Sequence, residues 1–421
     1  MLLDPLTSND RVFAAINPHM LGWARQSLGL SIQEAAESLS IPMERMRLWE
    51  SGADSSDRPT VSQAERLAKL YDRPFSLFYL PSPPAEPALP PDFRFTPEAM
   101  AGSLPPMLRK IIRRAHAQRE VALSLAEDLG ETNEHFPVIE RRTGLDSDPE
   151  AIGVQVRQWL GIGDKPFSSF TAAEKRFDAW RTALEDRGFL VFMSVDSAPA
   201  SLFRGFALVH DRAPVLAINN KDEKPARLFT LLHELGHVLL RVPGVSGDPL
   251  DIPQEATEQV RIERWCNCFA AAALVPEVLL RAESTFTPVV SLFARSEPWE
   301  KEHDFLLRGM GKRFGVSAEV IVRRLVTLGS ISVQTYREWR VWWYLKYPIR
   351  REPDSDKKSG PGQTIMVPHR LGYGFLRVVF EAYWRDRVNL SDLCRLVGNV
   401  QISTARKIEN RFKARLFAMA G

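Results

Sequence analysis

Cysteine is scarce in this chain of 421 residues, which has three, and Cys266 and Cys268 are separated by a single residue. So few thiols in that arrangement exclude a disulfide framework of the kind that stabilises small secreted domains. Free thiols are typical of proteins in a reducing compartment. We therefore expect a cytoplasmic protein.

Long apolar runs and an excess of one charge are also missing. No stretch reaches the roughly 20 consecutive apolar residues that a membrane-spanning helix needs. The first 17 residues carry Asp4, Asp10 and Arg11 and lack the apolar core of a signal peptide. The net charge is only +3, so nucleic-acid binding would have to come from a local module. No membrane contact is expected.

An HExxH sequence, His233 to His237, lies inside an apolar segment that predicts a helix. The two histidines are four residues apart, so they share one face and both imidazoles can reach a single ion. Zinc suits two neutral nitrogens and one oxygen ligand, although manganese or iron could occupy such a site. The ion would lower the pKa of a bound water towards neutrality, and Glu234 could accept its proton. Gly236 would let another backbone segment approach this helix closely.

The pentapeptide alone has a second interpretation. HExxH arises by chance in many proteins, and two histidines on an apolar helix can be ordinary core residues. The apolar neighbours that would bury the helix are Leu231, Leu232, Leu235, Val238 and Leu239. The downstream sequence favours the metal site.

A second helix is predicted over residues 255–276, apolar in its second half and stopped by Pro276. Glu263 stands at the start of the buried half and is the best candidate for a third ligand. Asn267 lies four residues on, where its amide oxygen could accept the second ring N–H of His233 or His237 and fix the tautomer.

Three other residues of this segment are alternative ligands. Glu255 and Glu258 are favoured as solvated residues of the first helical turn, where the helix dipole stabilises negative charge. Cys266 is a possible soft ligand, but a small buried residue among alanines is the favoured interpretation.

Three strands are predicted before the HExxH helix, over residues 189–195, 203–209 and 214–219. We expect the last of them, over 215–219, to be the edge strand to which an extended peptide adds. Residues 243–253 are expected to form a loop over the site. His210, in the turn between two strands, could assist oxyanion binding, although an inert turn histidine is favoured.

The N-terminal part predicts a bundle of short helices. The first spans 18–28, and Ser31 with Glu34 forms a capping box that opens a second helix ending at Leu39. A third runs from Pro42 to Trp49 with Gly52 just beyond it. Ser62 and Glu65 are a further capping pair, expected to open a fourth helix that ends at residue 71.

Residues 31–52 resemble the helix-turn-helix of the Xre/Cro/C1-type repressor family. Ala36 occupies the tight helix–helix contact, Ile41 plugs the core after the turn, and residues 49–52 match the closing W-E-x-G. Ser40 replaces the usual turn glycine, and Ile32 replaces a glutamine that commonly contacts DNA. The resemblance implies that residues 18–80 bind DNA, with the third helix in the major groove.

The expected DNA-contacting residues are Gln33, Met43, Arg45 and Arg47. The two arginines can serve guanine or phosphate, whereas Glu44 opposes phosphate. The alternative is a helix-turn-helix kept for protein interaction or dimerisation.

The segments 229–237 and 263–276 together resemble the ImmA/IrrE family of metallopeptidases. The family pattern is F-T-x-x-H-E-x-x-H followed by E-x-x-A-N-x-F-A-A-x-L-L-x-P, and both parts occur here in order. The resemblance implies that His233, His237 and Glu263 bind zinc, with Glu234 as general base and a partner Xre-type repressor as substrate. Cys266 replaces the family's usual alanine, and here a repressor-like module lies on the same chain.

Basic and aromatic clusters elsewhere are expected to be structural. The helix over 105–129 carries five cations that we interpret as a solvated face rather than a nucleic-acid contact: Arg109, Lys110, Arg113, Arg114 and Arg119. Residues 311–329 have a second helix-turn-helix pattern, with Ser317 as cap and Arg323 and Arg324 exposed, and packing on the core is favoured over DNA contact. Residues 336–347 gather three tryptophans, which are expected to pack in a core or interface rather than stack on bases.

The sequence as a whole predicts a mainly helical α+β chain with a zincin-like core. The expected division is a helix-turn-helix domain (1–80), a proline-rich linker with helices (81–165), the metallopeptidase core (166–295), a helical extension (296–348), a linker (349–366) and a C-terminal helical domain (367–421). We expect a zinc metallopeptidase that cleaves a repressor-like protein and binds DNA, and a homodimer is one oligomeric state that this arrangement allows. The alternative is a transcriptional regulator or antitoxin-like protein whose metal domain is a non-proteolytic sensor.

Overall fold

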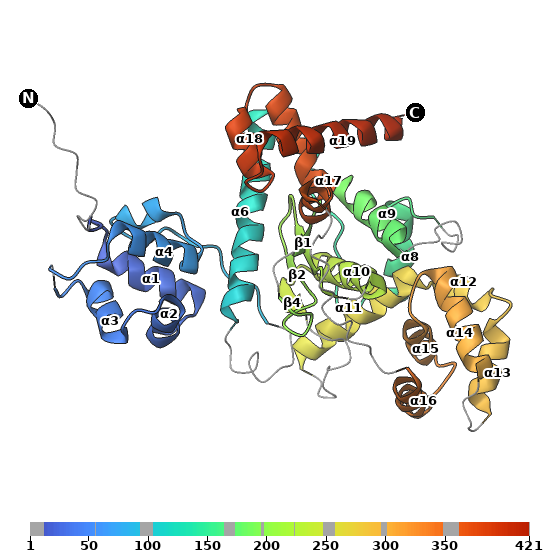
Figure 1. Cartoon of the computed structure of the whole chain (residues 1–421). Helices are drawn as coiled ribbons and strands as arrows, with labels where there is room; N and C mark the ends of the chain where they lie inside the picture. Colours follow the sequence, from blue (N-terminus) through green and yellow to red (C-terminus); the bar gives the residue numbers. More distant parts are fainter. Residues whose placement is uncertain are drawn as a thin grey trace, which may run out of the picture. The chain divides into compact units, whose positions relative to one another are not determined.

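The computed structural model of this chain describes residues 12–54, 56–92, 104–163, 173–194, 198–222, 224–246, 257–295, 301–347 and 362–420. The chain divides into two compact units. The first comprises Met1–Leu89 with Pro97–Arg114, and the second comprises Pro90–Thr96 with Ala115–Gly421. The expected α+β class is confirmed, because helices dominate and one four-stranded sheet is present among the described residues (Figure 1).

The first unit is a bundle of short helices. Its elements are α1 (Pro18–Leu28), α2 (Ile32–Leu39), α3 (Met43–Ser51), α4 (Val61–Tyr71), the 3-10 helix η1 (Phe75–Tyr79) and the start of α6 (Pro106–Asp128). Met46 and Trp49 of α3 are buried against α1 and α4 residues in one apolar cluster. Arg25 and Glu50 form an ion pair of 2.7 Å between α1 and α3, which gives the glutamate of the W-E-x-G sequence a structural role.

The turn between α2 and α3 explains why Ser40 is unusual at its position. Ser40 adopts the left-handed conformation, with φ 55° and ψ 47°. A residue with a Cβ pays about 1 kcal/mol there relative to glycine. The turn lets the Ile41 amide donate to the Ala36 carbonyl oxygen over 2.9 Å, so the chain leaves α2 at the angle that α3 requires.

The predicted cap of α4 was wrong by two residues. Thr60, not Ser62, is the N-cap, and its side chain accepts from the Gln63 amide in a complete capping box. Both pairs satisfy the pattern of a hydroxyl followed three residues later by Glu or Gln. The backbone decides between them, since Thr60 is still extended, with φ −65° and ψ 160°, and Ser62 is already helical.

The sheet of the second unit contains β1 (Leu190–Ser194), β2 (Gly205–Leu208), β3 (Val215–Asn219) and β4 (Gly244–Ser246) in the order β1-β3-β2-β4. β1 pairs with β3 in parallel, and the other neighbours are antiparallel. Two expectations are therefore wrong. β3 is an interior strand because β1 pairs along the side that β2 leaves open. Residues 244–246 form an edge strand within the predicted loop over 243–253, and residues 247–253 of that loop lie outside the described residues.

Helices cover this sheet and hold the HExxH segment. α10 (Lys224–Leu240) packs on β2 and β3 and along α11 (Glu258–Leu274), and α11 packs against α8 (Pro149–Trp159) (Figure 1). α9 (Ala173–Glu185) and the short α7 (Thr132–His135) complete this part. Arg119 of α6 is buried, contrary to the expected solvated face, and donates to the Arg212 and Ala213 carbonyl oxygens.

The α8–α11 contact is so close that it depends on a glycine. A Cβ at Gly153 would lie 2.9 Å from the Ala273 amide nitrogen and 3.0 Å from the Ala272 Cβ. We expect Gly153→Ala to destabilise the second unit by about 1–3 kcal/mol, because backbone must move to admit the methyl group. Urea unfolding measures this. The matched control is Gly309→Ala in α14, where no atom lies within 4 Å, and equal midpoints for the two variants would contradict the prediction.

The helices that follow α11 are α12 (Glu277–Arg281), α13 (Phe286–Ala294), α14 (Lys301–Phe314), α15 (Ala318–Thr327) and α16 (Val333–Lys346). Ser317 caps α15 as predicted. Arg324 is buried rather than exposed, and its Nε donates to the Val275 carbonyl oxygen over 2.8 Å. Val275 is the C-cap of α11, so this arginine satisfies a carbonyl that the helix end leaves unpaired. Trp339 is fully buried, as the core interpretation predicted.

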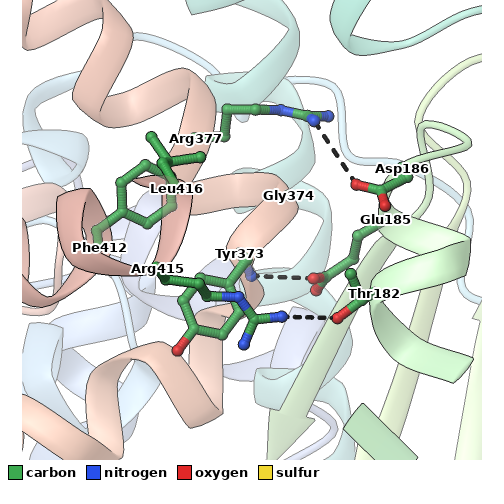
Figure 2. A pocket seen from close by; sticks show the side chains of 9 residues that line it. All are labelled: Thr182, Glu185, Asp186, Tyr373, Gly374, Arg377, Phe412, Arg415 and Leu416. Atoms are coloured by element: carbon green, nitrogen blue, oxygen red, sulfur yellow. Dashed lines mark hydrogen bonds and ion pairs between the residues drawn. The ribbon is translucent and has the colours of Figure 1, made fainter. Parts of the chain in front are cut away.

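Three helices end the chain: α17 (Gln363–Trp384), α18 (Leu390–Leu396) and α19 (Ile402–Ala420). α17 packs on β1 and α9. A cavity of about 100 Å³ lies between α9, α17 and α19. The Arg415 Cζ atom lies 3.7 Å from the centre of the Tyr373 ring, and Arg415 donates to the Thr182 hydroxyl. Figure 2 shows the side chains that line this cavity. None of the predicted site residues lines this cavity. Among the described residues, no helix is both long and apolar enough to span a membrane.

Candidate metal centre

α10 brings His233, Glu234 and His237 into the interior of the second unit. Its apolar residues face the sheet on one side and α11 on another, so the helix is buried nearly all round. The exposed fractions are 3% for His233 and 0% for Glu234 and His237. Glu263 of α11 is also only 3% exposed. Four ionisable side chains buried together need partners, because an isolated buried charge is very costly.

The donor atoms of three of these residues meet at one point. The Nε2 atoms of His233 and His237 are 3.2 Å apart. The Glu263 carboxylate lies 3.3 Å from the His233 Nε2 and 3.1 Å from the His237 Nε2. A tetrahedral zinc ion with bonds of about 2.0–2.1 Å holds its ligand atoms roughly 3.3 Å from one another. Two imidazole nitrogens and a carboxylate at these separations fit zinc.

The outer nitrogens of both imidazoles are held by hydrogen bonds. The His233 Nδ1–H donates to the Asn267 Oδ1 over 2.9 Å, and the His237 Nδ1–H donates to the Val242 carbonyl oxygen over 3.2 Å. Each bond leaves the Nε2 lone pair directed at the centre. The expected contact between Asn267 and one of the histidines is therefore present, and it is made with His233.

We expect Asn267→Ala to weaken zinc binding by about 10–100-fold, the usual effect of removing a group that orients a ligand. The His233 ring would lose the bond that fixes its tautomer. Competition with a colorimetric chelator measures the affinity. Asn267→Asp keeps an acceptor oxygen and should recover most of the lost affinity, so wild-type affinity in the alanine variant would contradict this role.

Charge coupling between His233 and Glu263 shifts the pKa values of both residues. Burial alone would lower the pKa of His233, but the Glu263 carboxylate raises it to about 9. Burial would raise the pKa of Glu263, and the two histidines instead lower it to about 2. The two shifts share one cause, the attraction between the His233 imidazolium and the Glu263 carboxylate, and a metal ion bound by both groups would compete with that proton.

Glu234 occupies a different environment from Glu263. Burial raises the pKa of Glu234 to about 7, against the opposing effect of His237 and His233. Neither carboxylate oxygen has a hydrogen-bond partner of good geometry among the described residues, although the Ser246 hydroxyl is near enough to lower its pKa. A buried carboxyl with a pKa near neutrality has the property that a general base requires.

Two residues beside this centre escaped the sequence prediction. A Cβ at Gly205 of β2 would lie 2.7 Å from the Glu234 Oε1, so only glycine lets the strand pass there. The Ser246 Oγ of β4 lies 3.4 Å from the His237 Nε2. A glycine inside a strand pattern is a known sign of close backbone approach, and that signal could have directed attention to Gly205.

The part of the chain that contains this centre matches a known protein family. Residues 184–326 match the family model described as Peptidase M78, IrrE N-terminal-like domain. This segment is an IrrE N-terminal-like domain. No curated protein matches the chain. The match supports a metallopeptidase of the ImmA/IrrE type, as the sequence motifs indicated.

The IrrE N-terminal-like domain contains α10 and α11, and with them the four residues of the centre. Cys266 lies in this domain as well, with its sulfur within 4.8 Å of ligand atoms of the two histidines. Burial raises the pKa of its thiol well above the ordinary value, whereas the Glu263 carboxylate approaches the two Nε2 atoms to 3.3 and 3.1 Å. Its sulfur would also lie 3.0 Å from a Cβ at Gly236, so Gly236 admits α11 as expected. Glu263 is the better placed third donor.

Two of the remaining candidates, Glu258 and His210, lie outside the group of converging side chains. Glu258 is exposed at the first turn of α11, and Glu255 lies outside the described residues. His210 stacks edge-on against His116 at 6.1 Å between ring centres, and it follows the end of β2 opposite to Gly205.

The four predicted DNA-contacting residues lie in the first unit, outside the IrrE N-terminal-like domain. Arg45 is engaged by Asp57 through bonds of 2.7 and 2.9 Å. Arg47 is half exposed and lies 3.3 Å from Glu44. Gln33 is exposed at the start of α2 and bonds Glu37, and Met43 packs partly into the apolar cluster.

Proposed function

We propose that this chain is a zinc-dependent endopeptidase of the ImmA/IrrE type joined to a DNA-binding helix-turn-helix, and that it cleaves a repressor-like protein to control transcription in a stress, prophage or mobile-element response. The observation that supports it best is the convergence of His233, His237 and Glu263 at separations of 3.1–3.3 Å. Glu234 lies between the two histidines on α10, buried and without a hydrogen-bond partner of good geometry among the described residues.

The residues of the chain would divide the chemistry in the following way. His233, His237 and Glu263 would hold the ion, which supplies the Lewis acidity that makes water acidic near neutral pH and polarises a peptide carbonyl. Glu234 would take a proton from the attacking water and pass it to the amide nitrogen of the leaving segment. Asn267 and Val242 would hold the imidazoles in the tautomer that presents Nε2.

The test of the peptidase is direct. The zinc-loaded full chain is incubated with a repressor-like protein encoded near its own gene, and fragments are identified by mass spectrometry. A single defined cut that disappears after chelation and returns with added zinc supports the proposal. Cleavage that is unaffected by complete removal of the metal would refute it.

The DNA-binding part of the proposal predicts different effects for the two arginines of α3. Among the described residues, Arg47 pairs only with neighbours on its own helix, the exposed Glu44 and Met43, and such a surface ion pair is weak enough to exchange for a phosphate or base. We therefore expect Arg47→Ala to weaken binding to the chain's own upstream DNA about tenfold. Arg45 already bonds Asp57, and Arg45→Ala should change the affinity less. Fluorescence anisotropy at fixed salt measures both, and equal affinities for wild type and Arg47→Ala would contradict this placement.

A non-proteolytic sensor is the second candidate, and the burial of the centre favours it. With all four side chains at most 3% exposed, the site as it stands does not admit a polypeptide. In that case DNA affinity would change with zinc content, Glu234→Gln would leave it unchanged, and no protein would be cleaved.

A further inference from the structure

The outer edge of β4 is already occupied by a piece of the same chain. β4 is the edge strand next to β2. The Val245 amide donates to the Pro91 carbonyl oxygen over 3.0 Å, and Asp92 forms a parallel bridge with Val245. Residues 90–92 thus add to the sheet as a short extra strand, within the second compact unit.

The same segment is held from a second side by α11. The Gln259 side-chain amide donates to the Asp92 carbonyl oxygen over 2.8 Å. Gln259 stands one helical turn before Glu263, on the helix that brings the carboxylate to the histidines. Residues 90–92 therefore contact both β4, which carries Ser246 near His237, and α11, which carries Glu263.

Burial sets these residues apart from the rest of the proline-rich stretch. Residues 81–89 are all exposed, and Pro90 is the first buried residue after them. Pro90 and Pro91 have restricted φ angles and no amide hydrogen. They can lie extended along a sheet edge at a small entropic cost. Their backbone can accept hydrogen bonds from that edge but cannot donate any.

We infer that the β4 edge is the site at which an extended substrate segment binds, and that residues 90–92 are an intramolecular competitor for it. The inference rests on the proposed peptidase function and adds its regulation. A substrate that binds by adding a strand needs the free Val245 amide, and that amide is paired to Pro91. An extended substrate can pair with this amide only after residues 90–92 are displaced.

The test compares the same substitution at two positions. Pro90→Asp places a carboxylate at a buried position, which disfavours the docked segment. Pro84→Asp makes the same change at an exposed position of the same stretch and is the matched control. Gln259→Ala is a second route to the same end, since it removes the bond to the Asp92 carbonyl while leaving the proline-rich stretch intact.

Two readouts on the zinc-loaded full chain decide the question. Hydrogen–deuterium exchange of the Val245 amide should become faster in Pro90→Asp and in Gln259→Ala, and stay unchanged in Pro84→Asp. The affinity for a blocked Pro-Leu-Gly hydroxamate, which combines a peptide with a zinc-binding group, should rise about tenfold in the first two variants. Acetohydroxamate, which has no peptide part, should bind all the proteins equally.

The outcomes separate the inference from the proposed function. Unchanged exchange at Val245 in both test variants would overturn the docking of residues 90–92. Faster exchange with no gain in affinity for the peptide hydroxamate would overturn the competition, while acetohydroxamate binding would still support a metal centre. Failure of acetohydroxamate to bind any of the proteins would instead refute the metal centre itself.

Discussion

Replacing Glu234 with glutamine is expected to slow peptide-bond cleavage by about 10²–10⁴-fold, the usual contribution of a general base. Glutamine has nearly the same shape and fits beside Gly205, but its amide cannot accept the proton of water. The zinc content should stay the same, because Glu234 is not one of the three converging donors. The change therefore separates catalysis from metal binding.

The measurement is the rate of fragment formation from a repressor-like substrate, with zinc content determined on the same samples. Glu258→Gln is the matched control. It makes the same chemical change at an exposed position in the first turn of α11, outside the group of converging side chains. Equal cleavage rates for wild type and Glu234→Gln would show that the assigned base is wrong. Loss of zinc together with activity would instead place Glu234 among the ligands.

Replacing Glu263 with alanine is expected to lower the zinc affinity by more than about 100-fold, a larger loss than that from an orienting residue. The substitution removes the oxygen donor, so that only the two histidines remain as protein ligands. It also removes the carboxylate that raises the pKa of His233, so the histidine would lose its proton at a lower pH than in the wild-type protein.

Zinc content after gel filtration in the presence of a weak chelator measures this loss. Glu258→Ala is the control on the same helix, and Cys266→Ser tests the alternative donor. We expect zinc to be retained in both controls. Retention in Glu263→Ala with loss in Cys266→Ser would make the thiol, rather than the carboxylate, the third ligand.

The sequence predicted where β1, β2 and β3 lie along the chain, but not how they pair or that a fourth strand joins them. The three-residue run of β4 is too short for any alternation of polar and apolar residues to reveal it. β3 carries the same apolar pattern whether it is an edge or an interior strand, because its position depends on β1 and β2. Arg324 was expected in solvent because a cation on a helix usually is, and only the end of α11 explains its burial.

The amino-acid order by itself determined the helices and the chemistry they carry. Spacings of four residues place His233 with His237 and Glu263 with Asn267 on common faces, since helical geometry is local. Tertiary structure alone decided what meets these faces: the passage of Gly205 over Glu234, the edge position of β4 and its pairing with residues 90–92. Such contacts join segments that are far apart along the chain, and their pairing is set by the packing of the whole unit rather than by any local pattern.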